Sequence, residues 1–147
     1  MAQKYLRYEI VPLQEIMDDI FLNWGQEKIR VRRPSGKWVG VTSLRMKTFA
    51  RAFKSEAGAK CVTCGCAAEF FAVETTPGQE QPHLNLYGIK DGVEILFTHD
   101  HRLARALGGR DNLSNSQLMC SPCNSNKSIA ESKEVQRRRK LAKKSNN

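Results

Sequence analysis

The sequence lacks any apolar run that approaches the length of a membrane span, so a membrane-spanning helix is not expected. Residues 1–8 lack the apolar core of a secretory signal peptide, and no internal repeat is present. An even-numbered cysteine framework is also missing, because the five cysteines include two Cys-x-x-Cys pairs and one extra thiol. These absences argue against a secreted, disulfide-stapled protein and favour a cytoplasmic protein whose thiols are free to bind metal.

Acidic residues are scarce relative to basic ones. The 15 Asp and Glu residues face 24 Lys and Arg residues, which gives a formal net charge of +9. A positive field of this kind attracts polyanions, and nucleic acid is the commonest of them. Each basic group taken alone is also compatible with an ordinary solvated surface. The candidates for contact with the nucleic-acid backbone are Arg30, Arg32, Arg33 and Lys37 in one group, Arg102 and Arg105 in a second, and Arg137, Arg138 and Arg139 in a third.

The first part of the chain predicts a helix, a hairpin and a second helix. Apolar residues recur at helical spacing over residues 13–24, and residues 29–41 alternate around a Pro-Ser-Gly-Lys turn. Thr42 or Ser43 can cap the helix that follows. We expect a basic helix–hairpin–helix extension over residues 1–58 that contacts nucleic acid or a partner.

The second part changes to strands and turns. A short strand is predicted near residues 70–73, and a hairpin over residues 84–98 is centred on Lys90-Asp91-Gly92. Residues 117–119 read as a brief strand. A helix then begins at Ser121 or Pro122 and continues into the basic residues 137–140, with a frayed end beyond them. The pattern as a whole predicts an α+β fold.

The paired cysteines predict a structural zinc site. Cys61 and Cys64 form one pair and Cys120 and Cys123 form the other, and two such turns supply four thiolates for a tetrahedral ion. Cys66 complicates this assignment, because it could replace Cys61 or Cys64, although a spare thiol is favoured. A site closed by four sulfurs has no open position for a substrate, so the reactive centre must lie elsewhere.

A second group of residues has the chemistry of phosphodiester hydrolysis. Asp100 and His101 are adjacent at the end of a predicted strand, and Asn124 follows the second cysteine pair. A neutral imidazole can act as a base near pH 7, and carboxylate and amide oxygens can hold a hard divalent ion. Neighbours on a strand point to opposite sides, so we expect the chain to turn between Asp100 and His101 to bring both to one site.

The order of these residues is that of a known family. The segments Asp100-His101, Gly108-Gly109, Asn115-x-Gln117-Leu118-Met119 and Cys120-x-x-Cys123-Asn124-x-x-Lys127 together resemble the HNH endonuclease family, especially its zinc-containing phage and bacterial members. The resemblance extends back to Cys61 and covers roughly half of the chain. It implies a ββα-metal HNH module stapled by a four-cysteine zinc site over residues 59–134, followed by a basic tail over residues 135–147.

The resemblance also implies a role for each matched residue. Asp100 and Asn124 correspond to ligands of the catalytic ion, and His101 corresponds to the general base. Asn115 corresponds to the central asparagine that pins the loop, and Lys127 corresponds to a lysine placed near phosphate.

Two features leave the assignment open. Many family members have a proline three residues after the base, where this chain has Ala104. His99 would exchange roles with His101 if the register differed by two residues. His83 is expected to be an ordinary polar residue.

The sequence therefore predicts a metal-dependent HNH endonuclease that acts on DNA in preference to RNA and nicks one strand as a monomer. Its cofactors would be Zn²⁺ for structure and Mg²⁺ or Mn²⁺ for catalysis. The alternative is a zinc-stabilised nucleic-acid-binding or phage accessory protein that keeps the scaffold without independent cleavage. A phage packaging or replication partner and a bacterial or phage-infected cytoplasm fit both hypotheses.

Overall fold

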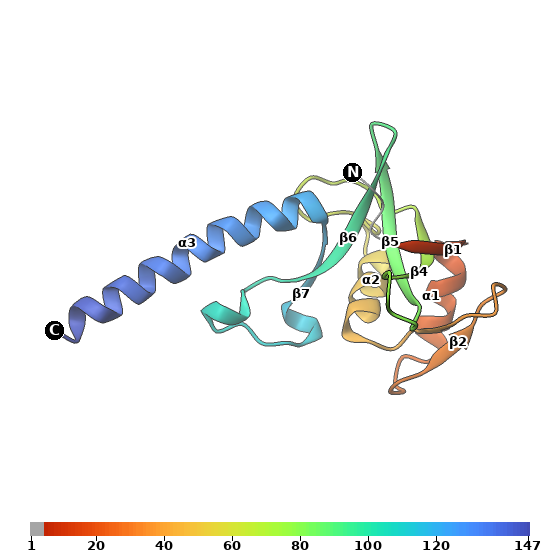
Figure 1. The fold of residues 1–147 in the computed structure, drawn as a ribbon, viewed down its shortest axis with the longest axis horizontal. Coiled ribbons are helices and arrows are strands. Elements are labelled where there is room, and N and C mark those ends of the chain that lie inside the picture. Colours follow the sequence, from red (N-terminus) through yellow and green to blue (C-terminus); the bar gives the residue numbers. More distant parts are fainter. Residues whose placement is uncertain (1–4) are drawn as a thin grey trace.

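The computed structural model describes residues 5–147 and has a mixed α+β architecture. Over these residues it contains a five-stranded sheet in the order β1-β4-β5-β6-β7, a two-stranded hairpin and three α-helices (Figure 1). Every strand pair is antiparallel. The elements are β1 (Leu6–Pro12), α1 (Leu13–Leu22), β2 (Arg30–Arg32), β3 (Trp38–Gly40), α2 (Leu44–Lys54), β4 (Phe70–Thr75), β5 (His83–Lys90), β6 (Val93–His101), the short 3-10 helices η1 (Arg105–Leu107) and η2 (Leu113–Asn115), β7 (Ser116–Cys120) and α3 (Ser121–Ser145).

Strand β1 is the main difference from the sequence-based expectation for the first part of the chain. The helix, hairpin and helix occur in the predicted order, but β1 precedes them and pairs with β4. Its polar residues Arg7 and Glu9 point inward, whereas Leu6, Tyr8 and Ile10 point outward. This inverted pattern hides the strand from any search for inward-facing apolar residues.

The core joins the first part of the chain to the sheet. Buried Ile16 of α1 and Phe49 of α2 belong to the same apolar cluster as Phe71 of β4 and Leu118 of β7. Ser43 begins α2 by accepting a hydrogen bond from the backbone N–H of Met46 at 3.2 Å, as predicted. One hydrophobic cluster includes residues on both sides of residue 58. The division predicted there, between a basic extension and a nuclease module, therefore stays a prediction about function.

The predicted hairpin of the second part is confirmed as β5 and β6. Its turn uses Asp91 at φ 51° and Gly92 at φ 76°, two successive left-handed residues that match the twist of the strands. Strand β6 continues to His101 and pairs with β7 from Phe97↔Cys120 to His101↔Ser116. Helix α3 starts directly after β7, so β6, β7 and α3 form a ββα unit.

Helix α3 leaves the body of the molecule after its first turns (Figure 1). None of its residues is buried, and it continues through Ser145 instead of fraying near Lys143. No helix in the described part of the chain has the length and apolar character needed to cross a bilayer.

Candidate active site and cysteine cluster

The four paired cysteines come together at the junction of β7 and α3. Cys120 ends β7 and Cys123 lies in the first turn of α3, while the loop after α2 brings in Cys61 and Cys64. The four sulfur atoms lie within 4.8 Å of one another. Cys66 lies outside this group, in agreement with its assignment as a spare thiol. The cluster is compatible with a tetrahedral zinc ion.

Within the cluster Cys61 favours the thiolate, whereas burial and the neighbouring cysteine side chains raise the pKa of Cys120. Burial raises the pKa of Cys61, but hydrogen bonds from the backbone N–H groups of Cys64, Cys120 and Thr63 outweigh it and lower the pKa to about 6. The knuckle is held by Gly65 N donating to Cys61 O at 3.0 Å and Val62 N donating to Leu118 O at 3.1 Å. These backbone contacts form the first cysteine turn and attach it to β7.

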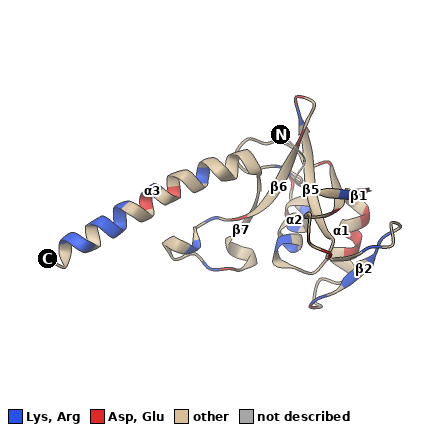
Figure 2. Ribbon diagram, viewed as in Figure 1, with Lys and Arg blue, Asp and Glu red and all other residues tan. Residues whose placement is uncertain are grey.

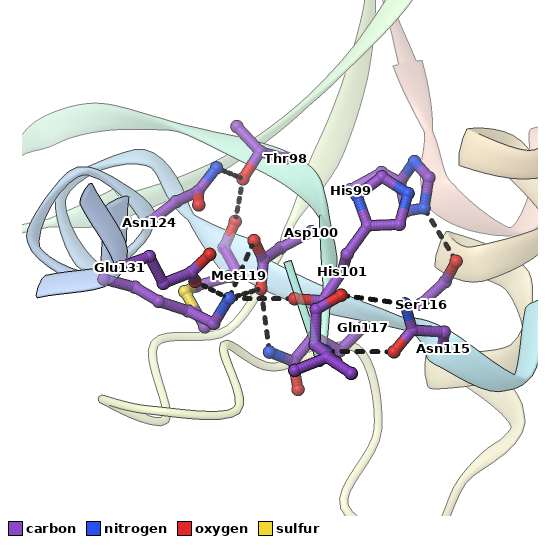
Figure 3. A network of polar contacts seen from close by, with 12 residues as sticks. Thr98, His99, Asp100, His101, Asn115, Ser116, Gln117, Met119, Asn124 and Glu131 are labelled. Carbon is purple, nitrogen blue, oxygen red and sulfur yellow. Dashed lines mark hydrogen bonds and ion pairs between the residues drawn. The ribbon is translucent and has the colours of Figure 1, made fainter. Parts of the chain in front are cut away.

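The end of β6 carries two faces with different chemistry. Asp100 pairs with Gln117 and His101 with Ser116, so the strand is regular through both residues. The expected turn between Asp100 and His101 is therefore wrong, because β7 holds the chain extended up to His101. The two histidine rings lie on one side of the strand and the Asp100 carboxylate lies on the other (Figure 3).

Asp100 faces α3 and is held by neighbouring polar groups. Its Oδ2 atom accepts a hydrogen bond from Gln117 Nε2 at 2.8 Å and lies 3.2 Å from Lys127 Nζ. Lys127 also donates to the carbonyl oxygen of His101 at 2.8 Å and contacts the Glu131 carboxylate. Partial burial lowers the pKa of Lys127, but the two carboxylates outweigh this effect and raise it. Three oxygen groups thus converge on one positive charge.

Asn124 lies on the same side of β6, next to Thr98. The Thr98 hydroxyl donates to the carbonyl of Met119 at 2.9 Å, so it must accept the hydrogen bond from Asn124 Nδ2 at 3.1 Å. This network orients the Asn124 amide and leaves its Oδ1 atom available as an oxygen ligand (Figure 3). Because Thr98 and Asp100 are two residues apart on one strand, Asn124 and Asp100 share a face.

His101 is paired with a residue that the sequence did not single out. Its Nε2 atom lies 2.8 Å from Asp111 Oδ1 in the loop after η1. The His101 contact lowers the pKa of Asp111, so the carboxylate is ionised near neutral pH and accepts the proton of Nε2. The ring is thereby fixed in the tautomer whose Nδ1 can accept a proton.

The loop between β6 and β7 is pinned by Asn115. Its Oδ1 accepts from Leu103 N at 2.9 Å, and its Nδ2 donates to Leu103 O at 3.0 Å and Arg110 O at 2.8 Å. Gly109 packs against these hydrogen bonds so closely that a Cβ there would be 1.8 Å from Leu103 O. Both residues therefore fix the loop that presents Asp111 to His101.

This arrangement can be compared with known families. Residues 88–129 match the family model described as HNH endonuclease. The chain therefore contains a segment that is similar to an HNH endonuclease domain. The matched segment runs from the end of β5 through β6 and β7 into α3, so it contains the ββα unit and both polar faces of β6. HNH domains bind a divalent metal and HNH nucleases act on nucleic acid, so the match supports a nuclease. Neither the search of curated proteins nor the search of solved structures found a match.

The predicted nucleic-acid contacts belong to three segments of the chain. Arg30, Arg32, Arg33 and Lys37 belong to the β2–β3 hairpin, whereas Arg137, Arg138 and Arg139 lie on the far half of α3 (Figure 2). Arg102 and Arg105 lie in the loop that follows His101. Several of these charges are already paired, since Arg33 contacts Glu15 at 3.0 Å and both Arg137 and Arg138 contact Glu134. Ala104 and Ala106, which flank Arg105, line one surface hollow together with Arg139, so the loop group lies beside α3.

The residues that sequence reasoning missed around this site are Asp111, Gln117 and Glu131. Asp111 sits in a loop, and no regular spacing connects it to His101. Gln117 could have been paired with Asp100 only from the register of β6 and β7. Glu131 is four residues after Lys127 on α3, a helical spacing that predicts an ion pair.

Proposed function

We propose that this chain is a metal-dependent endonuclease that hydrolyses DNA phosphodiester bonds and nicks one strand as a monomer. His101 is the general base, and Asp100 and Asn124 hold a divalent ion, Mg²⁺ or Mn²⁺. The observations that support the proposal are an oriented imidazole and a carboxylate beside an amide at the end of β6. Because they lie on opposite faces, the proposal requires the scissile phosphate to lie across the strand end, within reach of both.

The base is ready to accept a proton. Asp111 binds the proton on Nε2 of His101, so Nδ1 of the neutral ring takes the proton from the attacking water. The carboxylate of Asp111 then stabilises the imidazolium, as a base-orienting acid does in other hydrolases. Asn115 contributes by fixing the loop that carries Asp111.

The donors on the α3 face fit a hard cation. Asp100 and Asn124 supply a carboxylate and an amide oxygen, the ligand types that Mg²⁺ prefers. Lys127 binds to the Asp100 carboxylate and the His101 carbonyl, so a divalent ion must displace this ammonium group to contact Asp100. A divalent ion bound at this face would supply a sink for charge that develops on the phosphate and leaving oxygen.

The remaining parts support the same activity. Zinc at the cysteine cluster would hold β7, α3 and the loop after α2 together, and its four sulfurs leave no open position for chemistry. Lys127 and the basic residues of the hairpin, loop and α3 would bind phosphates without reading sequence. We place this activity in a bacterial or phage-infected cytoplasm, with a phage packaging or replication protein as its partner.

The rival function is a nucleic-acid-binding or phage accessory protein without independent cleavage. The observation that favours it is the ion pair between Lys127 and Asp100, because a divalent ion must compete with that ammonium group. The test is nicking of supercoiled plasmid with Mg²⁺ or Mn²⁺ by the parent, His101→Ala and the control His83→Ala. We expect the parent and the control to nick and His101→Ala to be inactive. DNA binding without nicking by the parent would favour the rival.

A further inference from the structure

The histidine face of β6 combines three metal-ligating side chains that the proposed Mg²⁺ site does not use as ligands. His99 and His101 are two residues apart on the strand, so their rings share a face, with centroids 5.1 Å apart (Figure 3). Asp111 reaches the same place from the loop. One ring nitrogen of each histidine and one oxygen of Asp111 lie within 4.8 Å of one another.

We propose that His99, His101 and Asp111 form a binding site for a borderline transition-metal ion of the Zn²⁺, Co²⁺ or Ni²⁺ type. This site is separate from the cysteine cluster and from the Asp100–Asn124 pair. An ion that coordinates Nε2 of His101 requires the tautomer with the proton on Nδ1, so the ring can no longer accept a proton there and the nuclease is inhibited. The inhibitory consequence rests on the function proposed above, whereas the binding of the ion does not.

The spacing of the donors suits one shared ion. Bonds of about 2.1 Å to imidazole nitrogen and carboxylate oxygen separate neighbouring ligand atoms by about 3–3.5 Å. His101 Nε2 and Asp111 Oδ1, at 2.8 Å, are already close to that separation. The third donor needs a shift of about 1 Å or slightly more, which small side-chain rotations supply. Asp111 is half exposed, so its movement is not opposed by packing.

An outer hydrogen bond orients His99 as it does in known metal sites. The hydroxyl of buried Ser116 donates to the Asn112 carbonyl at 2.6 Å, so its single proton is used there. Its contact with His99 Nε2 at 2.7 Å must therefore use a proton on the ring. Nδ1 of the neutral ring keeps its lone pair, and the protonated nitrogen is held by a hydroxyl, the arrangement that fixes a ligating histidine.

The two faces of β6 select different ions by donor type. Two imidazoles and one carboxylate suit borderline ions, whereas a carboxylate with an amide oxygen suits Mg²⁺. His101 belongs to the first set as a ligand and serves the second as the base. The same strand thus separates an activating ion from an inhibitory one.

The binding test uses the untagged chain with zinc already loaded in the cysteine cluster. Co²⁺ is added and followed by calorimetry and by its visible absorption. We expect one further equivalent to bind without sulfur-to-cobalt charge-transfer bands. Loss of a direct ligand should cost at least the ~10–100-fold found for outer-shell partners, so His99→Ala and Asp111→Asn should each weaken binding tenfold or more. The control is His83→Ala, which removes the histidine outside the cluster.

Two results would overturn the site. One is equal Co²⁺ affinity in the parent, His99→Ala and Asp111→Asn. The other is absorption that reports sulfur ligands, which would assign the ion to cysteine. Asp111→Asn is nearly isosteric at a half-exposed position, so a folding defect in His99→Ala would not leave the question open.

The inhibition test measures Mg²⁺-supported plasmid nicking as Co²⁺ is raised. Each variant is normalised to its own rate without Co²⁺. We expect half-inhibition of the parent at the Co²⁺ concentration that half-fills the site, and about tenfold more Co²⁺ for His99→Ala. Co²⁺ binding by a chain that never nicks DNA would contradict the proposed function and keep the metal site. Nicking that is indifferent to bound Co²⁺ would contradict the inhibition alone.

Discussion

Two clusters of polar residues, one around Glu74 and one around Asp100 and His101, lie on the same sheet and differ in how deeply they are buried. Glu74 of β4 is fully buried and accepts hydrogen bonds from Arg7 Nε at 2.8 Å, Asn85 Nδ2 at 2.8 Å and Tyr87 Oη at 2.5 Å. Asp100 of β6 is held by Gln117 and Lys127, and its neighbour His101 reaches the half-exposed Asp111. Every partner of Glu74 lies on the sheet, whereas those of Asp100 and His101 include Lys127 on α3 and Asp111 in an exposed loop.

The difference separates a structural role from the functional role that we propose. A buried carboxylate surrounded by donors holds strands together and has no room for a ligand. A carboxylate whose main partner is a flexible lysine can exchange that partner for another cation. Asp100 is therefore a candidate ligand for a metal ion, because a cation can replace Lys127 beside it, whereas Glu74 is not.

Removal of the proposed zinc ion is expected to have the largest effect, and it should act on the junction of β7 and α3. Structural zinc sites in small domains contribute on the order of 10 kcal/mol. We expect a chelator, or Cys120→Ser, to open the junction of β7 and α3 while β1, β4 and β5 stay folded. Hydrogen exchange resolved by segment measures this. Cys66→Ser is the control and should change little, because its sulfur lies outside the cluster. Equal loss of protection in β4 and β7 would show that the ion stabilises the whole sheet and not the junction of β7 and α3 alone.

Among substitutions in the buried cluster of Glu74, Arg7, Asn85 and Tyr87, Glu74→Ala should lower the free energy of unfolding the most. It leaves Tyr87 without its buried acceptor, whereas Arg7 keeps Glu94 as a carboxylate partner, so the expected cost is about 1–3 kcal/mol. Urea unfolding of the zinc-loaded chain measures the loss. Glu80→Ala in an exposed loop is the matched control. A loss below about 1 kcal/mol for Glu74→Ala would show that the cluster is not a structural tie.

Tyr87→Phe should cost about 1–2 kcal/mol at neutral pH, since it removes one donor to Glu74. It should also change how the free energy of unfolding falls at alkaline pH. Burial, followed by the contact with Glu74, raises the pKa of Tyr87 above its usual value near 10. The unfolded chain then loses this proton first, so stability falls as the pH rises above about 10. Unfolding midpoints at pH 8 and 11 should show a smaller alkaline loss in Tyr87→Phe, with Tyr8→Phe as the control. An unchanged alkaline loss would contradict this assignment.

Lys127→Ala should have the smallest effect, and it should change only the metal requirement and DNA binding of the site around Asp100 and His101. Without the ammonium group, Asp100 no longer has to exchange one cation for another. We expect half-maximal nicking at a several-fold lower Mg²⁺ concentration, together with weaker DNA binding from the loss of one phosphate contact. Lys133→Ala, on an exposed part of α3, is the control. A higher Mg²⁺ requirement in Lys127→Ala would mean that the lysine assists the ion.

The sequence predicted the second part of the fold better than the first. The β5–β6 hairpin, β7 and the start of α3 follow from local turn chemistry and periodicity, and the cysteine spacing predicted the cluster. Strand β1 could not be found in this way, because Arg7 and Glu9 face inward toward partners far along the chain. The candidate site was predicted by residue type, but the contacts of His101 with Asp111 and of Asp100 with Lys127 depend on tertiary packing.

The nuclease proposal is tested most directly by single-turnover cleavage of labelled DNA at saturating protein, with the parent, His101→Ala and Asp100→Asn. Under these conditions DNA binding no longer limits the rate. Loss of a positioned base alone should lower the rate about 10²–10⁴-fold, and loss of the carboxylate should cost at least as much. His83→Ala should cleave as fast as the parent. Cleavage by His101→Ala at the parental rate would contradict the assignment of the base.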